Sequence, residues 1–176
     1  MKLNVVLFQP EIPQNTGNIM RTCVGVGAKL HLIKPLGFSL DEKHLRRSAV
    51  DYYEFIEYEC YENFDDFLTK NPDARIYFST RYGHKPLSSF NLKEDDRDIY
   101  LMFGCESKGI PYELLANNID TCFRLPTNDK VRSLNLSNCV AVALFEVLRQ
   151  YDYMDLLTEE PDTLKGANFL DQFKCE

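Results

Sequence analysis

The sequence predicts one α/β domain with a mainly parallel sheet that helices cover on both faces. Short apolar runs alternate along the chain with segments of helical spacing, a rhythm typical of parallel sheets. With 176 residues, of which 44% are hydrophobic, the chain is long enough for one well-packed core and short for two. No repeat, low-complexity tract or obvious linker interrupts it. We expect a single domain over residues 1–176, with a tail from about residue 155 that ends in a short helix near 167–173.

The first half of the chain contains three predicted strands and two predicted helices. The runs "LNVVLF" (3–8) and "KLHLI" (29–33) have strand character, and residues 15–26 between them have helical spacing. "EFIEYEC" (54–60) is a predicted strand. "NFDDFLTKN" (63–71) is a predicted short helix with Asn63 as its N-cap.

The second half continues the alternation. "ARIYFST" (74–80), "DIYLMFG" (98–104) and "DTCFRL" (120–125) are predicted strands. "PYELLANN" (111–118) is a predicted helix with proline in its first turn, where the missing N–H needs no partner. A long helix over about 136–151 follows.

Several protein classes are disfavoured by composition. The longest apolar runs are too short to cross a bilayer, and the N-terminus runs into a strand pattern without a cleavable signal, so we expect a cytoplasmic protein with no membrane contact. The six cysteines form no CxxC pair, which indicates neither a metal site nor a disulfide framework. We expect them to be reduced and mostly buried.

The charge is acidic overall but unevenly spread. A formal net charge of −7 argues against binding nucleic acid over the whole surface. Several cations nevertheless lie near the polar motifs: "KHLRR" (43–47), Arg21, Lys108, Lys130 and Arg132. A local basic patch on an acidic protein is consistent with this distribution.

Polar loops follow the predicted strands, and in a parallel sheet ligands bind beyond the carboxyl ends of the strands. Four such loops occur: "QPEIPQNTGNIMR", "STRYGHKP", "GCESKGIP" and "LPTNDKVRSLNLSN". None contains GxGxxG or GxxxxGK[ST], so a dinucleotide site or a P-loop is not expected.

The motif "FGCESKGIP" has two interpretations. It fits a strand-to-helix turn in which Gly104 and Gly109 supply positive φ and the charges are solvated. Alternatively, Gly104 lets a flat ligand approach the backbone while Glu106 meets a hydroxyl or a cation. The motif alone leaves both open.

The motif "PQNTGNIMRTC" presents a similar choice. Asn15 or Thr16 could cap the following helix, with Arg21 as a surface charge. However, Asn15, Asn18 and Arg21 recur at i, i+3 spacing near a helix start, and two amides with a guanidinium there suit a phosphate or a ribose.

Taken together, three stretches resemble a known family. "PEIPQNTGNIMRTC", "LMFGCESKGIP" and "FRLPTNDKVRSLNLSN", in this order and at these distances, are similar to the motifs of the SPOUT class of RNA methyltransferases. The resemblance spans about residues 3–151. It is strongest to the minimal members that methylate the ribose 2'-hydroxyl of the wobble cytidine or uridine of tRNA.

The resemblance implies a C-terminal trefoil knot, an exception to the rule that chains do not thread loops. It also implies a homodimer and S-adenosylmethionine as the cofactor, bound by loops around Phe78, Gly104, Leu125 and Ser133. The apolar stretch "CVAVALFEVL" independently favours a partner subunit, because it exceeds what one buried helix face requires.

The resemblance further implies roles for single residues. Arg21, Glu106, Ser133 and Asn135 would form the catalytic set, with Ser137 or Asn138 left to cap the long helix. A guanidinium is a poor base at its ordinary pKa, so Arg21 is expected to clamp a phosphate and stabilise the developing alkoxide. Asn15, Asn18 and Arg21 are expected to contact the anticodon stem-loop of tRNA. Arg46 and Arg47, on the basic segment "KHLRR", either contact RNA phosphates as well or form a solvated surface.

Two other functions compete with this interpretation. A non-enzymatic RNA- or nucleotide-binding module would fit the fold, and the net acidity favours it slightly. The joint presence of Arg21, Glu106, Ser133 and Asn135 disfavours it, because a binder needs no methyl-transfer constellation. A small-molecule hydrolase is a weaker choice, since none of the three histidines lies in a recognisable nucleophile motif.

Overall fold

The computed structural model describes residues 1–40, 52–154 and 156–174. Its centre is a six-stranded sheet with the order β3-β2-β1-β5-β4-β6, and every pairing is parallel. The strands are β1 (Leu3–Phe8), β2 (Lys29–Ile33), β3 (Tyr58–Tyr61), β4 (Arg75–Ser79), β5 (Ile99–Phe103) and β6 (Cys122–Phe123). The predicted α/β class with a parallel sheet is confirmed.

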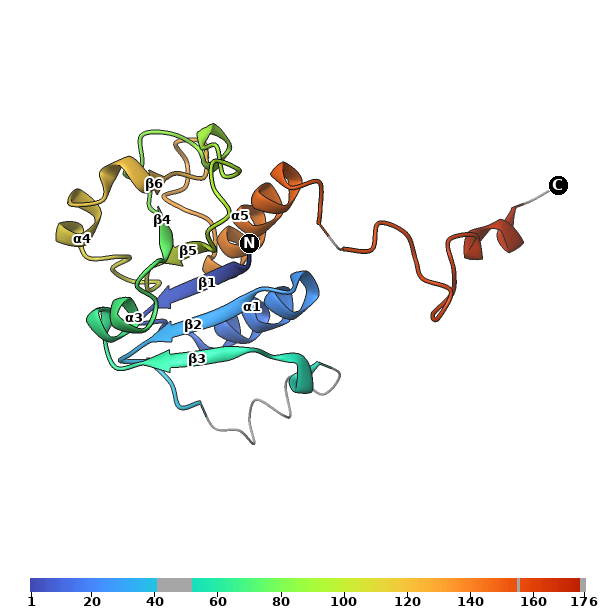
Figure 1. The fold of residues 1–176 in the computed structure, drawn as a ribbon, viewed down its shortest axis with the longest axis horizontal. Helices are drawn as coiled ribbons and strands as arrows, with labels where there is room; N and C mark the ends of the chain where they lie inside the picture. Colours follow the sequence, from blue (N-terminus) through green and yellow to red (C-terminus); the bar gives the residue numbers. More distant parts are fainter. Residues whose placement is uncertain (41–51, 155, 175–176) are drawn as a thin grey trace.

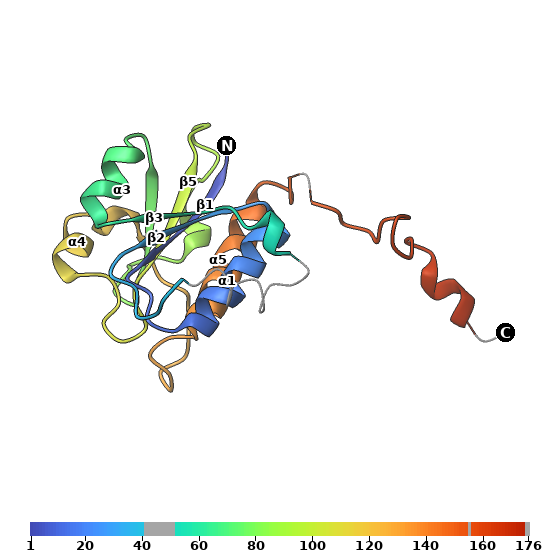
Figure 2. The same ribbon diagram turned by 90° about the horizontal axis from the view of Figure 1, so that it is seen from below.

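Helices cover both faces of the sheet. On one face lie α1 (Pro13–Val26) and α5 (Leu136–Gln150), and on the other lie α3 (Phe64–Lys70) and α4 (Tyr112–Ala116) (Figures 1 and 2). The sheet thereby separates two apolar cores. The larger core contains Ile19 of α1 and Leu144 of α5, and the smaller one contains Phe67 of α3. Both faces of the central strands are buried, which explains why these strands are mostly apolar.

Some predicted boundaries were wrong. Glu54 and Phe55, expected to begin a strand, lie instead in a 3-10 turn, Tyr53–Phe55, before β3. At the sheet edge β6 has only two residues instead of six, and the last predicted helix is the 3-10 segment Phe169–Phe173. Asn63 does cap α3 as predicted, since its side-chain oxygen accepts a 2.8 Å hydrogen bond from the Asp66 N–H.

Helix α1 begins earlier than predicted. Pro13 occupies its first turn and Ile12 its N-cap position, where no side chain caps the helix. Asn15 and Thr16 therefore lie inside the helix, and both are buried. Neither caps α1, so the capping role that one interpretation gave to Asn15 or Thr16 is wrong.

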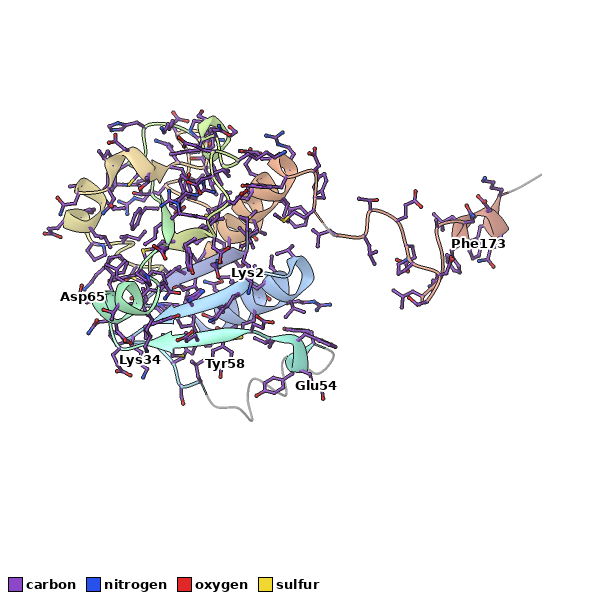
Figure 3. All side chains as sticks on the ribbon, viewed as in Figure 1. Lys2, Lys34, Glu54, Tyr58, Asp65 and Phe173 are labelled. Atoms are coloured by element: carbon purple, nitrogen blue, oxygen red, sulfur yellow. The ribbon has the colours of Figure 1, made fainter. Side chains whose placement is uncertain are left out.

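After α5 the chain leaves the domain. Leu156 still packs against the larger core, and residues 157–174 run outward from the sheet and its helices, ending near Phe173 (Figures 1 to 3). Large apolar side chains along this tail are exposed: Leu157, Leu164, Leu170 and Phe173. Within the described part of the chain, none of the helices is both long and apolar enough to cross a membrane.

The cysteines are less buried than expected. Of the five described, Cys23 and Cys122 are buried, while Cys60, Cys105 and Cys139 are only partly so. All five are free thiols. In the ranges 1–40, 52–154 and 156–174, no cluster of His, Cys, Asp and Glu side chains is placed to hold a metal ion.

Candidate active site

A cavity of about 490 Å³ lies beyond the carboxyl ends of β4, β5 and β6. Three loops form its walls, together with the start of α1 and residues of α4 and α5. The end of β4 and the loop after it contribute residues 79–82, and the loop after β5 contributes residues 104–110. The segment between β6 and α5 contributes several residues up to Asn135. Strands end at this edge together because the sheet is parallel, so loops far apart in sequence meet there.

Gly104 allows the loop after β5 to fold back on itself. A Cβ atom at this position would collide with the backbone of Gly109 and Ile110. The loop closes with a 2.9 Å hydrogen bond from the Gly109 N–H to the Cys105 carbonyl oxygen. Of the two glycines, Gly109 alone has positive φ, at 74°. The expectation that both supply positive φ was therefore wrong for Gly104, whose requirement is close backbone approach.

Glu106 accepts hydrogen bonds from three donors of the same chain. They are the Glu11 N–H at 2.9 Å, the Ile12 N–H at 3.3 Å and the Asn15 Nδ2 at 2.8 Å. Two are backbone donors at the start of α1, which lack helical partners and favour a negative charge. The Glu106 carboxylate thus anchors the loop after β5 to α1.

A reciprocal contact runs in the opposite direction. The Glu11 carboxylate accepts hydrogen bonds from the Ser107 N–H at 2.9 Å and from its Oγ at 2.6 Å. These bonds, the side-chain one first, lower the pKa of Glu11. The two loops are therefore joined by a pair of carboxylates, each accepting from the other loop.

Asn15 extends this network to α5. Its Oδ1 accepts a 3.0 Å hydrogen bond from Asn135 Nδ2. Asn135 Oδ1 in turn accepts from the Ser137 N–H at 2.9 Å and the Ser137 Oγ at 2.7 Å, so Asn135 is the N-cap of α5. The prediction that Ser137 or Asn138 caps this helix was wrong. Asn135 holds the cap because its amide nitrogen is fixed by Asn15.

The predicted cofactor-binding residues occupy different places. Gly104, Leu125 and Ser133 line the cavity, and the Ser133 side chain is exposed. Phe78 does not line it, because this side chain is buried in the smaller core. The next residue, Ser79 at the end of β4, and the loop that follows it supply the wall instead.

Asn15, Asn18 and Arg21 do not share one surface. Asn15 is buried, whereas Asn18 and Arg21 are exposed and do not line the cavity. Each step of three residues rotates the side chain by about 60° around the helix, so the third residue points about 120° away from the first. The Arg21 guanidinium lies over the Tyr52 ring, 5.6 Å from its centroid. Arg46 and Arg47, also predicted to bind RNA, lie outside the described residues.

The cavity is more basic than the protein as a whole. Its described lining includes one carboxylate, Glu106, and four cations: Arg81, Lys108, Arg124 and Arg132. Sequence reasoning had noted Lys108 and Arg132 but missed Arg81 and Arg124. A signal was present for Arg81, which immediately follows a predicted strand at the edge where ligands bind. Arg124 fell inside the predicted strand 120–125 and follows the strand only because β6 ends at Phe123.

Comparison with known proteins places this geometry in a family. The profile of the SpoU rRNA Methylase family matches residues 2–145. A Yersinia pestis protein named tRNA (cytidine(34)-2'-O)-methyltransferase is 42% identical over 164 residues, which cover 90% of this chain and 99% of that protein.

Solved structures agree with this assignment. One from Bacillus anthracis is 45% identical with a TM-score of 0.85, covering 90% of this chain and 99% of the other. A second, described as "Structural insights into the 2-OH methylation of C/U34 on tRNA", is 38% identical with a TM-score of 0.77, covering 86% and 97%. The family profile, which matches residues 2–145, includes all three loops of the cavity. This chain belongs to the SpoU methylase family, within the SPOUT class of methyltransferases.

Proposed function

We propose that this protein is an S-adenosylmethionine-dependent tRNA 2'-O-methyltransferase that modifies the ribose of the wobble nucleotide, cytidine or uridine 34. The observation that carries the proposal is the cavity at the carboxyl ends of β4, β5 and β6, whose three loops come from the three motifs that resemble the SPOUT class. The Yersinia pestis relative, which the alignment covers almost completely, has the same activity in its name.

The cavity fits the cofactor by size and by chemistry. Its volume of about 490 Å³ lies in the range of small-molecule sites. Ile110, Leu125 and Leu134 offer apolar surface, and Ser133 offers a hydroxyl. S-adenosylmethionine supplies an activated methyl group, so the protein has mainly to place the ribose hydroxyl and relieve it of its proton.

The residues of this chain divide into positioning and contacting groups. Glu106 and Asn135 act as positioning residues, because their side chains already bond the start of α1 and the start of α5. Ser133, with an exposed side chain on the cavity, orients the ribose or the cofactor. Arg21 lies on α1 outside the cavity of its own chain, and in this proposal its exposed guanidinium approaches the bound RNA from there, clamps a phosphate and stabilises the alkoxide that develops at the 2'-oxygen.

We further propose a homodimer. The outer face of α5 carries Val142 and Phe145, each 49% exposed, opposite the side that packs into the larger core. Two apolar side chains in the middle of one exposed helix face are typical of a contact surface. In a two-fold dimer the same surface meets its own copy, so one patch is sufficient. We also propose that the C-terminal part of the chain forms a trefoil knot and that the protein is cytoplasmic.

Mass mapping of nucleosides tests the function directly. Purified protein is incubated with unmodified tRNA and S-adenosylmethionine, and a reaction without the methyl donor serves as the control. We expect 2'-O-methylcytidine or 2'-O-methyluridine at position 34 only in the complete reaction. Cofactor binding by calorimetry without any methylated nucleoside would instead favour a binding module. A methyl group at another position would contradict the wobble assignment.

A further inference from the structure

Two tyrosines with exposed rings stand at the rim of the cavity. Tyr82 follows β4 and is 45% exposed, and Tyr112 begins α4 and is 64% exposed. Their ring centroids are 5.7 Å apart at an interplanar angle of 80°, and their hydroxyl oxygens are 3.5 Å apart. The two rings come from segments 30 residues apart and touch each other in front of the cavity. Neither ring contributes much to a core.

Arginines hold this pair in place. The Arg81 guanidinium lies 4.7 Å from the centroid of the Tyr82 ring, and its Nη2 donates a 2.7 Å hydrogen bond to the Tyr82 hydroxyl. Arg124 Nη1 donates a 3.3 Å hydrogen bond to the Arg81 carbonyl oxygen. The pKa of the Tyr82 phenol is lowered, first by the hydrogen bond with Tyr112 and then by that from Arg81. Arg132 adds a further positive charge nearby.

We propose that Tyr82 and Tyr112, with Arg81, form a stacking site for an unpaired nucleobase of the RNA adjacent to the methylated nucleotide. The proposal rests on the proposed function and extends it to base recognition. Unpaired bases stack on aromatic rings and guanidinium planes in most recognition of single-stranded RNA. The neighbouring arginines match the phosphates of such a strand, although the protein as a whole is acidic.

The alternative ligand for the rings is the adenine of the cofactor. The exposure of both rings favours the RNA, because the outer rim of the cavity is where a macromolecule can reach. The two ligands are separated by measuring their affinities independently.

The test measures binding of an anticodon stem-loop RNA to the full-length protein in the presence of S-adenosylhomocysteine, which prevents turnover. Four proteins are compared: wild type, the double variant Tyr82→Leu/Tyr112→Leu, the double variant Tyr82→Phe/Tyr112→Phe, and Tyr58→Leu. Tyr58 is 39% exposed and lies on β3, at the opposite edge of the sheet from β6 (Figure 3). A second RNA carries an abasic ribose beside the wobble nucleotide.

We expect the leucine double variant to bind the intact RNA about tenfold or more weakly, as the loss of one stacked base implies. The phenylalanine variant and Tyr58→Leu should bind like the wild type, because the first keeps both rings and the second is remote. The abasic RNA should bind the wild type with a similar loss. The leucine variant should lose nothing further, since the stacking contact is already absent. Its affinity for S-adenosylmethionine should be unchanged.

Three results would overturn the proposal. The first is unchanged RNA affinity of the leucine variant. The second is a loss of affinity for the abasic RNA in the leucine variant that adds to the loss caused by the substitutions alone. The third is an equal loss of affinity for S-adenosylmethionine, which would assign the rings to the cofactor. A wild-type protein that leaves the intact stem-loop unmethylated would overturn the proposed function and the stacking site with it. Wild-type methylation with unchanged variant binding would remove the stacking site alone.

Discussion

Asn15 Nδ2 donates a 2.8 Å hydrogen bond to Glu106 Oε1, joining helix α1 to a loop 91 residues away in sequence. The other end of the Asn15 amide accepts from Asn135, so one side chain connects the loop after β5 to the start of α5. Three segments of the cavity wall thus share one hydrogen-bonded chain. This arrangement makes Glu106 a residue that shapes the site.

Replacing Glu106 should therefore affect both stability and cofactor binding. Glu106→Ala leaves three donors without their acceptor, and we expect the free energy of unfolding to fall by about 2 kcal/mol. Calorimetry should show weaker binding of S-adenosylmethionine, because the loop is no longer anchored. Glu113→Ala on α4 is the matched control, since Glu113 is exposed. Equal unfolding free energies for the two variants would contradict the anchoring role.

More of the fold than of the candidate site could be predicted from the sequence. Strands such as β1 and β5 are apolar runs buried on both faces, so composition alone locates them. Asn63 was predictable as a cap because the interaction is local, with the donor three residues away. The length of the short edge strand β6 could not be predicted, because it depends on how far β6 pairs with β4.

The site depends on contacts that sequence spacing cannot show. Ser133, Asn135, Ser137 and Asn138 offer similar oxygens near the start of α5, and the choice of Asn135 as cap follows from its contact with Asn15, 120 residues away. The motif around Glu106 was recognised, but its partners at the start of α1 are brought near by the parallel pairing of β1 with β5. Long-range partners of this kind require the fold.

A substitution at Gly104 tests how closely the loop after β5 packs against its own backbone. In Gly104→Ala the added Cβ must displace the backbone of Gly109 or Ile110, and we expect a loss of about 2 kcal/mol in the free energy of unfolding. Gly25→Ala is the control, because a Cβ in this part of α1 has nothing within 4 Å. It should stabilise by about 0.5 to 1 kcal/mol through helix propensity. Denaturant titration of both variants checks the opposite signs, and equal effects would refute the close-approach argument.

Buried His31 should make the free energy of unfolding fall as the pH is lowered. The ring is buried, with Nδ1 2.7 Å from the Tyr61 hydroxyl and Nε2 3.1 Å from Asn4 Oδ1. Burial, with a smaller effect from Lys29, lowers its pKa from 6.5 to about 4. Between these values the unfolded chain binds more protons than the folded one, so this contribution is full above pH 6.5 and is lost as pH falls toward 4. Its size is about 3 kcal/mol.

Denaturant titrations from about pH 7.5 down to about pH 4.5 measure this fall in stability. His31→Gln cannot gain a proton, so its stability should fall less steeply with acid than that of the wild type. The same substitution at exposed His84 controls for the loss of an imidazole at the surface. A His31→Gln variant with the wild-type slope would show that other groups dominate the fall in stability.

The proposed homodimer is tested on the outer face of α5. Phe145→Glu places a charge in the middle of the apolar contact, and we expect light scattering to give the mass of one chain, 20.5 kDa, where the wild type gives twice that mass. Phe55→Glu is the control, because Phe55 is an exposed phenylalanine in a 3-10 turn before β3. A dimeric Phe145→Glu variant would exclude this face, and a monomeric wild type at micromolar concentration would exclude the dimer.

Variants of Arg21 test whether this residue acts in methyl transfer and not in cofactor binding. Its exposed side chain lies on α1 and does not line the cavity, so Arg21→Ala should bind S-adenosylmethionine almost normally. Turnover should fall by about a hundredfold or more, because loss of one preorganised charge at a reacting centre costs on the order of 3 kcal/mol. Arg97→Ala, which removes an exposed arginine paired with Asp95, should leave the rate of tRNA methylation unchanged.

Arg21→Lys sharpens the test, since lysine keeps the charge but loses the planar fork that binds a phosphate through two donors. We expect it to remain well below the wild-type rate while still binding the cofactor. Single-turnover methylation of tRNA, measured at saturating cofactor, compares the three arginine variants with the wild type. If both Arg21 variants methylate at nearly the wild-type rate, Arg21 is only a surface charge over Tyr52. The mechanism would then need another group at the 2'-hydroxyl, even though the family assignment stands.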